Sequence, residues 1–233
     1  MRSAILSDIH SNLQALQQAL SLANSFKVDR IFCLGDIVGY GANPNECVDL
    51  VRKHCDTVVR GNHDLATVDL SHSWFHPEEA RVVNAWTLKK LRGENRRYLA
   101  WLPFRHDEEG YTLVHASPES PLDWDRIQSR ESAARQFSHF PAGVCFVGHT
   151  HIPFVLGEDL FSSKLKRGMK FLINVGSVGQ PRDGNPELSF GVFDTEAWTY
   201  ESIRSPYDVQ GAMNAIIAAG LPAGLGERLM TGV

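Results

Sequence analysis

The sequence lacks a long apolar stretch, and it has no strong excess of charge of either sign. Its apolar runs stay well short of the roughly 18 residues that a membrane-spanning helix requires, so we expect no membrane span. Residues 1–8 hold one short apolar run and an early acid, which is unlike a signal peptide, and the cytoplasm is the expected compartment. The formal net charge is −4 and lysine and arginine form no broad cluster, so we do not expect nucleic acid as a partner.

Cysteine is also scarce. The sequence has 4 cysteines among 233 residues, and none of them forms a CxxC pair. Without a secretory context we expect free thiols rather than disulfides, with Cys33 and Cys145 buried in apolar runs. The residues therefore give no support to a structural zinc site made of thiolates.

The first third of the sequence alternates short apolar runs with helical patterns. Apolar runs at 4–6, 31–34 and 57–59 predict three strands. Apolar residues at helical spacing predict a helix over 13–23, and a second helix is expected over 45–54. This β-α-β-α-β order is typical of a mainly parallel sheet with helices on its faces.

The rest of the sequence is richer in expected strands. We expect helices over 77–100 (with a break near Gly93), 129–140 and 209–219, and strands over 111–114, 144–147, 154–156, 170–174, 189–193 and 198–203. No repeat, low-complexity tract or linker divides the chain. We therefore expect one α/β domain over residues 1–233 that contains two sheets.

Polar side chains follow five of these expected strands, at the point where each strand ends. In chain order they are Asp8 and His10, Asp36, Asn62 and His63, His115, and His149 and His151. Taken singly, each motif is commonly a turn or a hydrogen-bonded histidine. Because open α/β sheets place ligand sites at the carboxyl ends of their strands, we expect the five groups to lie together.

The residue types in this set are those of a metal centre. Carboxylates, imidazoles and one amide oxygen suit Mn²⁺, Fe or Zn²⁺. The set is larger than one tetrahedral ion requires, whereas two ions about 3.5–4 Å apart that share one carboxylate would use all of it. We therefore expect two divalent metal ions, with Mn²⁺ favoured.

In the order of these motifs the sequence resembles the calcineurin-like metallophosphoesterase superfamily, and most closely its small bacterial and archaeal phosphodiesterase-like branch. Residues 35–47 and 174–182 also resemble that branch. The resemblance implies a four-layer sandwich of two mixed β-sheets flanked by α-helices. It implies that the first metal is held by Asp8, His10 and His151, that the second is held by Asn62, His115 and His149, and that Asp36 bridges them.

The function that this resemblance implies is the hydrolysis of phosphodiester or phosphomonoester bonds in small molecules such as nucleotides, by a hydroxide that bridges the two metals. His63 would donate a proton to the leaving group; the alternative is that it only orients Asn62. Arg182, in a loop rich in glycine, would bind a substrate phosphate; the alternative is a solvated arginine paired with Asp183. Segment 71–76 either lines the substrate entrance or packs between helices.

Two other functions stay open: a metal-dependent nuclease, and a non-catalytic scaffold on the same fold. Protein-phosphatase activity is not expected, because phosphoprotein phosphatases of the superfamily carry an aspartate and then an arginine where this sequence has Gly39 and Tyr40. Asp64 is a candidate to replace that aspartate beside His63. The sequence does not determine the substrate, the native metal or the oligomeric state.

Overall fold

The computed structural model describes residues 1–141 and 143–233, and its strands form two five-stranded mixed sheets. The first sheet has the order β10-β9-β1-β2-β3. Strands β1 (Arg2–Leu6), β2 (Arg30–Cys33) and β3 (Thr57–Val58) are parallel to one another. Strand β9 (Leu188–Asp194) pairs antiparallel with β1, and β10 (Thr199–Ser205) pairs antiparallel with β9.

The second sheet has the order β4-β5-β6-β8-β7. Its central strands β5 (Tyr111–Val114), β6 (Val144–Val147) and β8 (Phe171–Asn174) are parallel. The edge strands β4 (Arg105–Glu108) and β7 (Phe154–Gly157) run antiparallel to their neighbours.

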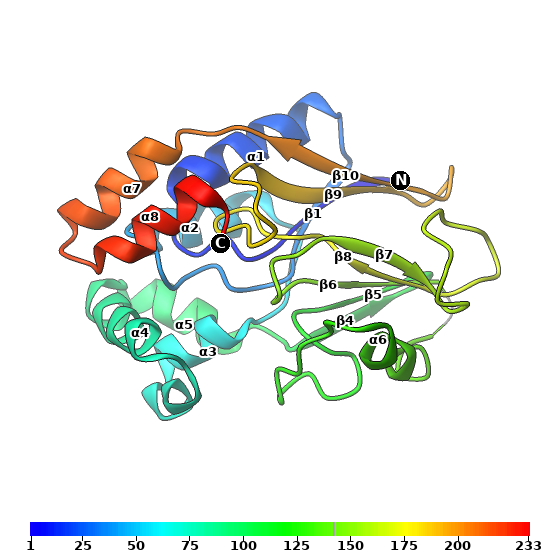
Figure 1. Ribbon diagram of the computed structural model, residues 1–233, viewed down its shortest axis with the longest axis horizontal. Helices are drawn as coiled ribbons and strands as arrows, with labels where there is room; N and C mark the ends of the chain where they lie inside the picture. Colours follow the sequence, from blue (N-terminus) through cyan, green and yellow to red (C-terminus); the bar gives the residue numbers. More distant parts are fainter. Residues whose placement is uncertain (142) are drawn as a thin grey trace.

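Helices cover the outer face of each sheet, which gives four layers (Figure 1). Helix α1 (Leu13–Ser25) and helix α2 (Pro44–His54) pack on the first sheet, and the short helix α6 (Arg130–Gln136) packs on the second. The start of α1 is fixed by Asn12, whose side chain accepts a hydrogen bond from the N–H of Ala15 at 3.1 Å. The predicted fold class, two mixed β-sheets flanked by helices, is confirmed.

The remaining helices gather at one end of the two sheets (Figure 1). They are α3 (Asn62–Val68), the 3₁₀ turn η1 (Leu70–Phe75), α4 (Glu78–Lys90), α5 (Gly93–Trp101), α7 (Val209–Ala218) and α8 (Ala223–Thr231). Among the described residues, no helix has the length and apolar character to cross a membrane.

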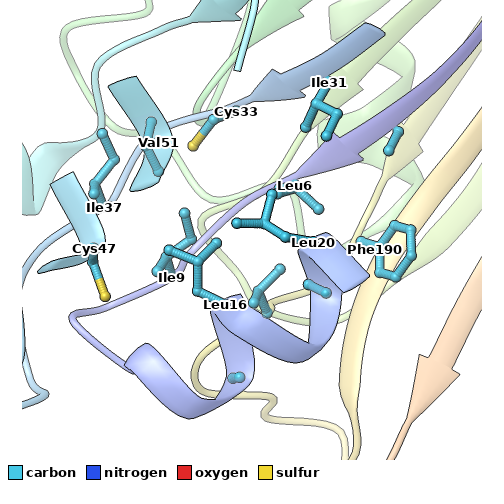
Figure 2. Packing of buried hydrophobic residues seen from close by; sticks show 14 of the residues in the cluster. Leu6, Ile9, Leu16, Leu20, Ile31, Cys33, Ile37, Cys47, Val51 and Phe190 are labelled. Carbon is cyan, nitrogen blue, oxygen red and sulfur yellow. The ribbon is translucent and has the colours of Figure 1, made fainter. Parts of the chain in front are cut away.

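Alternation along the strands explains why the first sheet is buried on both faces. Ala4 and Leu6 of β1 point toward α1, where they pack with Leu16 and Phe190 (Figure 2). Ile5, between them, points the other way into the apolar layer between the two sheets. A strand that buries both faces is apolar at successive positions, which is the pattern that predicted β1 from the sequence.

Several elements differ from the sequence-based expectation. Strand β4 was not predicted, because its residues Arg-His-Asp-Glu carry no apolar alternation and it is an edge strand. Helix α3, which begins at Asn62, was not predicted. Helix α6 ends at Gln136 rather than Phe140, and α8 was not predicted because two glycines interrupt its pattern.

Candidate metal centre

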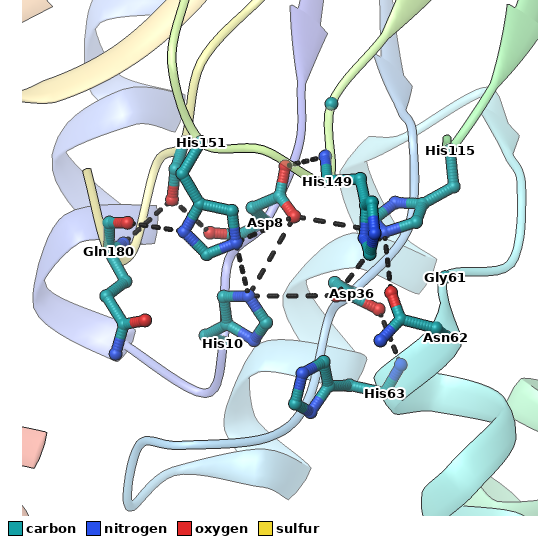
Figure 3. Close-up of polar contacts among 12 residues, drawn as sticks. Asp8, His10, Asp36, Gly61, Asn62, His63, His115, His149, His151 and Gln180 are labelled. Carbon is teal, nitrogen blue, oxygen red and sulfur yellow. Dashed lines mark hydrogen bonds and ion pairs between the residues drawn. The ribbon is translucent and has the colours of Figure 1, made fainter. Parts of the chain in front are cut away.

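The carboxyl ends of β1, β2, β3, β5 and β6 meet where the two sheets face each other, and the seven predicted ligands lie together there (Figure 3). All seven are at least nine-tenths buried. Two groups have ligand atoms within 4.8 Å of one another: Asp8, His10 and His151, and Asp36, His115 and His149. A third such group joins His10 and Asp36 to His63.

The backbone at this centre is unusual. Five of the seven predicted ligands have φ between 50° and 65°, in the left-handed region; they are Asp8, His10, Asp36, His149 and His151. This conformation costs a residue other than glycine roughly 1–2 kcal/mol. Strain of this kind persists where the surrounding structure enforces it, and it concentrates at functional sites. Each of these five residues lies within four positions of the end of the strand that it follows.

Two glycines allow the strand-end loops to approach closely. A Cβ atom at Gly61 would lie 2.1 Å from Oδ1 of Asp36, and a Cβ atom at Gly148 would lie 2.5 Å from Oδ2 of Asp8. A side chain at either position would clash with a carboxylate of the centre, and at Gly148 it would also clash with Oγ of Ser7, 2.1 Å from the added Cβ. The glycine before Asn62 and the glycine before His149 are therefore part of the site.

Backbone carbonyl groups fix the orientation of three imidazoles. Nδ1 of His10 lies 3.1 Å from the carbonyl of Val38, and Nδ1 of His115 lies 2.9 Å from the carbonyl of Leu34. Nδ1 of His151 lies 2.5 Å from the carbonyl of Gln180. A carbonyl only accepts, so in each neutral ring Nδ1 carries the proton and the Nε2 lone pair faces the centre. This is the arrangement that metal-binding histidines have in proteins.

Lone pairs consequently converge without hydrogen atoms between them. The Nε2 atoms of His10 and His151 are 3.1 Å apart. Oδ1 of Asp8 accepts no hydrogen bond from the described residues and lies 3.2 Å from Nε2 of His151. Acceptors this close repel each other unless a proton or a cation lies among them. The donor set therefore fits metal ions.

The charges at the centre agree with this conclusion. Burial alone would raise the pKa of Asp36, but the positive charge of His115 opposes burial most strongly, and the pKa of Asp36 lies well below its usual value. Burial also disfavours the cation of His115, yet the carboxylates of Asp36 and Asp8 raise the pKa of His115 to about 9. The two buried carboxylates thus require positive charge beside them. Burial lowers the pKa of His10 to about 3, which keeps that ring neutral and able to bind a metal.

His63 lies on α3, directly after Asn62. Its backbone N–H donates to Oδ1 of Asp36 at 2.8 Å. Its ring packs between those of His10, Tyr40 and His76, with centroids 4.9, 4.6 and 4.5 Å away. Burial holds the pKa of His63 well below its usual value, so the ring is neutral without substrate. Its Nδ1 has no hydrogen-bond partner among the described residues.

Asp64 does not replace the missing carboxylate beside His63. Its Oδ1 accepts the backbone N–H groups of Ile37 and Val38 at 2.9 and 3.2 Å, and its Oδ2 accepts that of Gly61 at 3.1 Å. This carboxylate therefore ties the loop that carries Asp36 to the start of α3.

Arg182 reaches the site from the loop that follows β8. Its Nη2 donates to Oε1 of Gln180 at 2.7 Å, and its guanidinium lies 5.5 Å from the centroid of the Tyr40 ring. Asp183 pairs with Arg204 instead, so the expected alternative of an Arg182–Asp183 pair is not what the structure contains.

A cavity of about 660 Å³ opens above the centre. Its floor includes Asp36, Asn62, His63, His149 and His151, and Arg182 lies in its wall.

Other wall residues were not predicted individually: Tyr40, His72, His76, Trp124, Arg126 and Arg228. The long turn-rich stretch after His115 was a possible signal for Trp124 and Arg126, whereas nothing in the sequence pointed to Arg228. From segment 71–76, His72 and His76 line the cavity, while Trp74 is 74% exposed and lies beside Arg81.

Comparison with known proteins gives a consistent result. The model of the calcineurin-like phosphoesterase superfamily domain matches residues 1–197. An uncharacterized protein of Methanocaldococcus jannaschii is 40% identical over 240 residues, which cover 98% of this chain and 97% of that protein. The crystal structure of a metallophosphoesterase from Sphaerobacter thermophilus is 40% identical, with a TM-score of 0.90 over 100% of this chain and 99% of the other.

A more distant relative has a named activity. The symmetrical bis(5'-nucleosyl)-tetraphosphatase of Vibrio parahaemolyticus is 30% identical over 136 residues, which cover 56% of this chain and 51% of that protein. The match to the domain model extends over most of the chain. This chain belongs to the calcineurin-like phosphoesterase superfamily.

Proposed function

We propose that this protein is a phosphoesterase that requires two divalent metal ions and hydrolyses phosphodiester or phosphomonoester bonds in small molecules such as nucleotides. The observation that supports this most directly is the 3.1 Å separation of two Nε2 lone pairs, those of His10 and His151, in a buried centre that also holds two carboxylates. Membership of the superfamily supports hydrolysis of a phosphoester. The tetraphosphatase activity named for a distant relative supports nucleotides as candidate substrates.

Each predicted ligand keeps its role in this proposal. One ion would be held by Asp8, His10 and His151, and the other by Asn62, His115 and His149, with Asp36 between them. Bound there, the ions would polarise the phosphoryl oxygens and lower the pKa of a water molecule. Mn²⁺ is the proposed metal, although Fe and Zn²⁺ also suit this donor set.

His63 and Arg182 would act on the substrate. A phosphate anion beside the buried His63 ring would raise its pKa, so the ring would take up a proton on binding and donate it to the leaving oxygen. Arg182 has a planar guanidinium that suits a phosphate, and Gln180 and Tyr40 hold it at the cavity wall. These contacts would orient the phosphoryl group over the carboxylates.

The shape and charge of the cavity favour a small substrate. A volume of about 660 Å³ lies within the range of roughly 300–1,000 Å³ that is usual for small-molecule sites. Three arginines stand in its wall: Arg126, Arg182 and Arg228. They suit a phosphorylated molecule, whereas a duplex would require a broader basic surface.

The experiment is a comparison of metal-stripped and Mn²⁺-reconstituted protein on bis-p-nitrophenyl phosphate and on p-nitrophenyl phosphate, with Asp36→Asn as the control variant. Turnover that depends on metal and is lost in Asp36→Asn supports the proposal, and the preferred ester separates a diesterase from a monoesterase. Equal turnover by the stripped and the reconstituted protein contradicts it. Failure of the folded wild-type protein to bind metal would favour a non-catalytic scaffold.

A further inference from the structure

His76 contacts two neighbouring residues of the centre at once. Its Nε2 lies 3.3 Å from Nδ2 of Asn62, and its ring packs edge-on against that of His63, with centroids 4.5 Å apart. His76 comes from the connection between η1 and α4, and it is half-buried in the cavity wall. Nothing in the metal-ligand pattern includes it.

The contact with Asn62 decides which end of the amide faces the metals. An amide has a donor end and an acceptor end, and only the oxygen can bind a cation. Nδ2 is a donor and donates to Nε2 of His76, and this leaves Oδ1 toward Nε2 of His115, 3.1 Å away. If the amide were reversed, its NH₂ group would face the metal site and one ligand would be lost.

The position of His76 is itself fixed. Its backbone N–H donates to the carbonyl of Ser73 at 3.0 Å, and Oγ of Ser73 accepts a hydrogen bond from Nδ2 of Asn84 at 3.1 Å. Ser73 and Asn84 are both buried. The backbone that carries His76 is therefore tied through Ser73 to α4, and not to the strand-end loops that carry most of the metal ligands.

From this geometry we infer that His76 is a positioning residue, which holds the Asn62 amide with its oxygen toward the second metal. The inference rests on the proposed two-metal function and adds to it a residue from outside the ligand set. Partners of this kind orient metal ligands throughout metalloproteins, and their loss costs about 10–100-fold in metal affinity or activity. Because His76 also touches His63, a loss of activity alone would not identify its role, whereas metal affinity does.

The test is calorimetric titration of metal-free protein with Mn²⁺. The wild-type titration reports on the proposed function, since two binding events per chain are expected there. For His76→Ala we expect the dissociation constant of one ion to rise about 10–100-fold, with the other ion little affected. His76→Gln keeps a hydrogen-bond acceptor and should bind both ions within a few-fold of the wild type. His72→Ala is the matched control, because His72 lines the same cavity and has no place in the centre.

A double-mutant cycle separates the proposed role from a general effect on the fold. If His76 acts through Asn62, His76→Ala should cause no further loss of Mn²⁺ affinity in an Asn62→Ala background. The inference is overturned if His76→Ala binds both ions as tightly as the wild type, if His76→Gln loses as much as His76→Ala, or if the two substitutions act additively. Should His76→Ala not fold, His76→Leu fills the space without an acceptor and replaces it in each comparison.

Discussion

Gly39 lies directly against the ring of His63: a Cβ atom at this glycine would be 2.8 Å from Nδ1 of the histidine. Gly39 also has a φ of +97°, which side chains rarely tolerate. This is the position at which phosphoprotein phosphatases of the superfamily carry an aspartate. A side chain does not fit here unless the His63 ring moves. The packing of Gly39 against His63 therefore explains why this protein has no aspartate at that position.

Replacing Gly39 by alanine should therefore reduce activity more than it reduces stability. We expect kcat of Gly39→Ala to fall at least about tenfold, because the His63 ring is displaced, with the strained backbone costing about 1–2 kcal/mol of unfolding free energy. Gly168→Ala is the control, since Gly168 has a φ of +82° but no atom within 4 Å of the added Cβ. Steady-state kinetics and urea unfolding of both variants check this. Full activity in Gly39→Ala would mean that catalysis does not require the His63 ring in its observed position.

The proposed role of His63 predicts a dependence on the leaving group. His63→Ala should lose about 10²–10⁴-fold in kcat on a diester with an alkyl leaving group, and much less on a p-nitrophenyl ester, whose departure needs little protonation. Metal content, measured by mass spectrometry, should stay at the wild-type level. Equal losses on both esters would instead favour the alternative that His63 orients Asn62.

Arg182 should contribute to substrate binding. Because a charge-assisted hydrogen bond to phosphate contributes about 1.5–3 kcal/mol, Arg182→Ala should raise KM for bis-p-nitrophenyl phosphate by about tenfold or more. Arg182→Lys keeps the charge but loses the planar fork, and should recover only part of the effect. A wild-type KM in Arg182→Ala would show that this guanidinium does not contact the substrate.

An ion pair between Arg30 of the first sheet and Glu108 of the second sheet joins the two sheets. Nη1 of Arg30, in β2, donates to both carboxylate oxygens of Glu108, in β4, at 3.0 Å. Tyr111 donates to the same carboxylate at 2.5 Å, and Nε2 of His106 lies 3.0 Å from it. Partial burial opposes the charged form, but hydrogen bonds from Tyr111, His106 and Arg30 outweigh it and lower the pKa of Glu108 to about 2.

This pair should make part of the stability sensitive to acid. A carboxyl whose pKa is lower in the folded state stabilises the fold at higher pH, and this contribution is lost as the pH falls from about 4.5 to about 2. Glu108→Gln should lower the unfolding free energy by about 1 kcal/mol at pH 7, and less at pH 3. Urea unfolding at both values checks this, with Glu109→Gln, a neighbouring exposed acid, as control. Parallel losses at the two pH values would contradict the account.

The sequence predicted most of the fold because buried strands leave a clear pattern. Strand β6 is apolar at all four positions, and it was placed at its observed bounds. The predicted ligands lie together because each follows its strand directly, so the register of the sheets fixes their positions. That these residues bind metal stays a prediction.

Features that depend on long-range contacts were not predictable. Strand β4 consists of polar residues, and its place is set by backbone pairing with β5. Helix α3 has only seven residues, which is too short to show a clear apolar period. Arg228 is 46 positions after Arg182 in the sequence, yet both line one cavity. Tertiary packing brings these residues together, and no local sequence pattern predicts it.

The most direct test of the account is a Mn²⁺ titration of metal-free protein, in which bound metal and hydrolysis of bis-p-nitrophenyl phosphate are measured in the same samples. We predict that two ions bind per chain, that activity appears only as the second site fills, and that Asp36→Asn loses both the second ion and the activity. Full activity with one bound ion per chain, or without any metal, would contradict a two-metal centre.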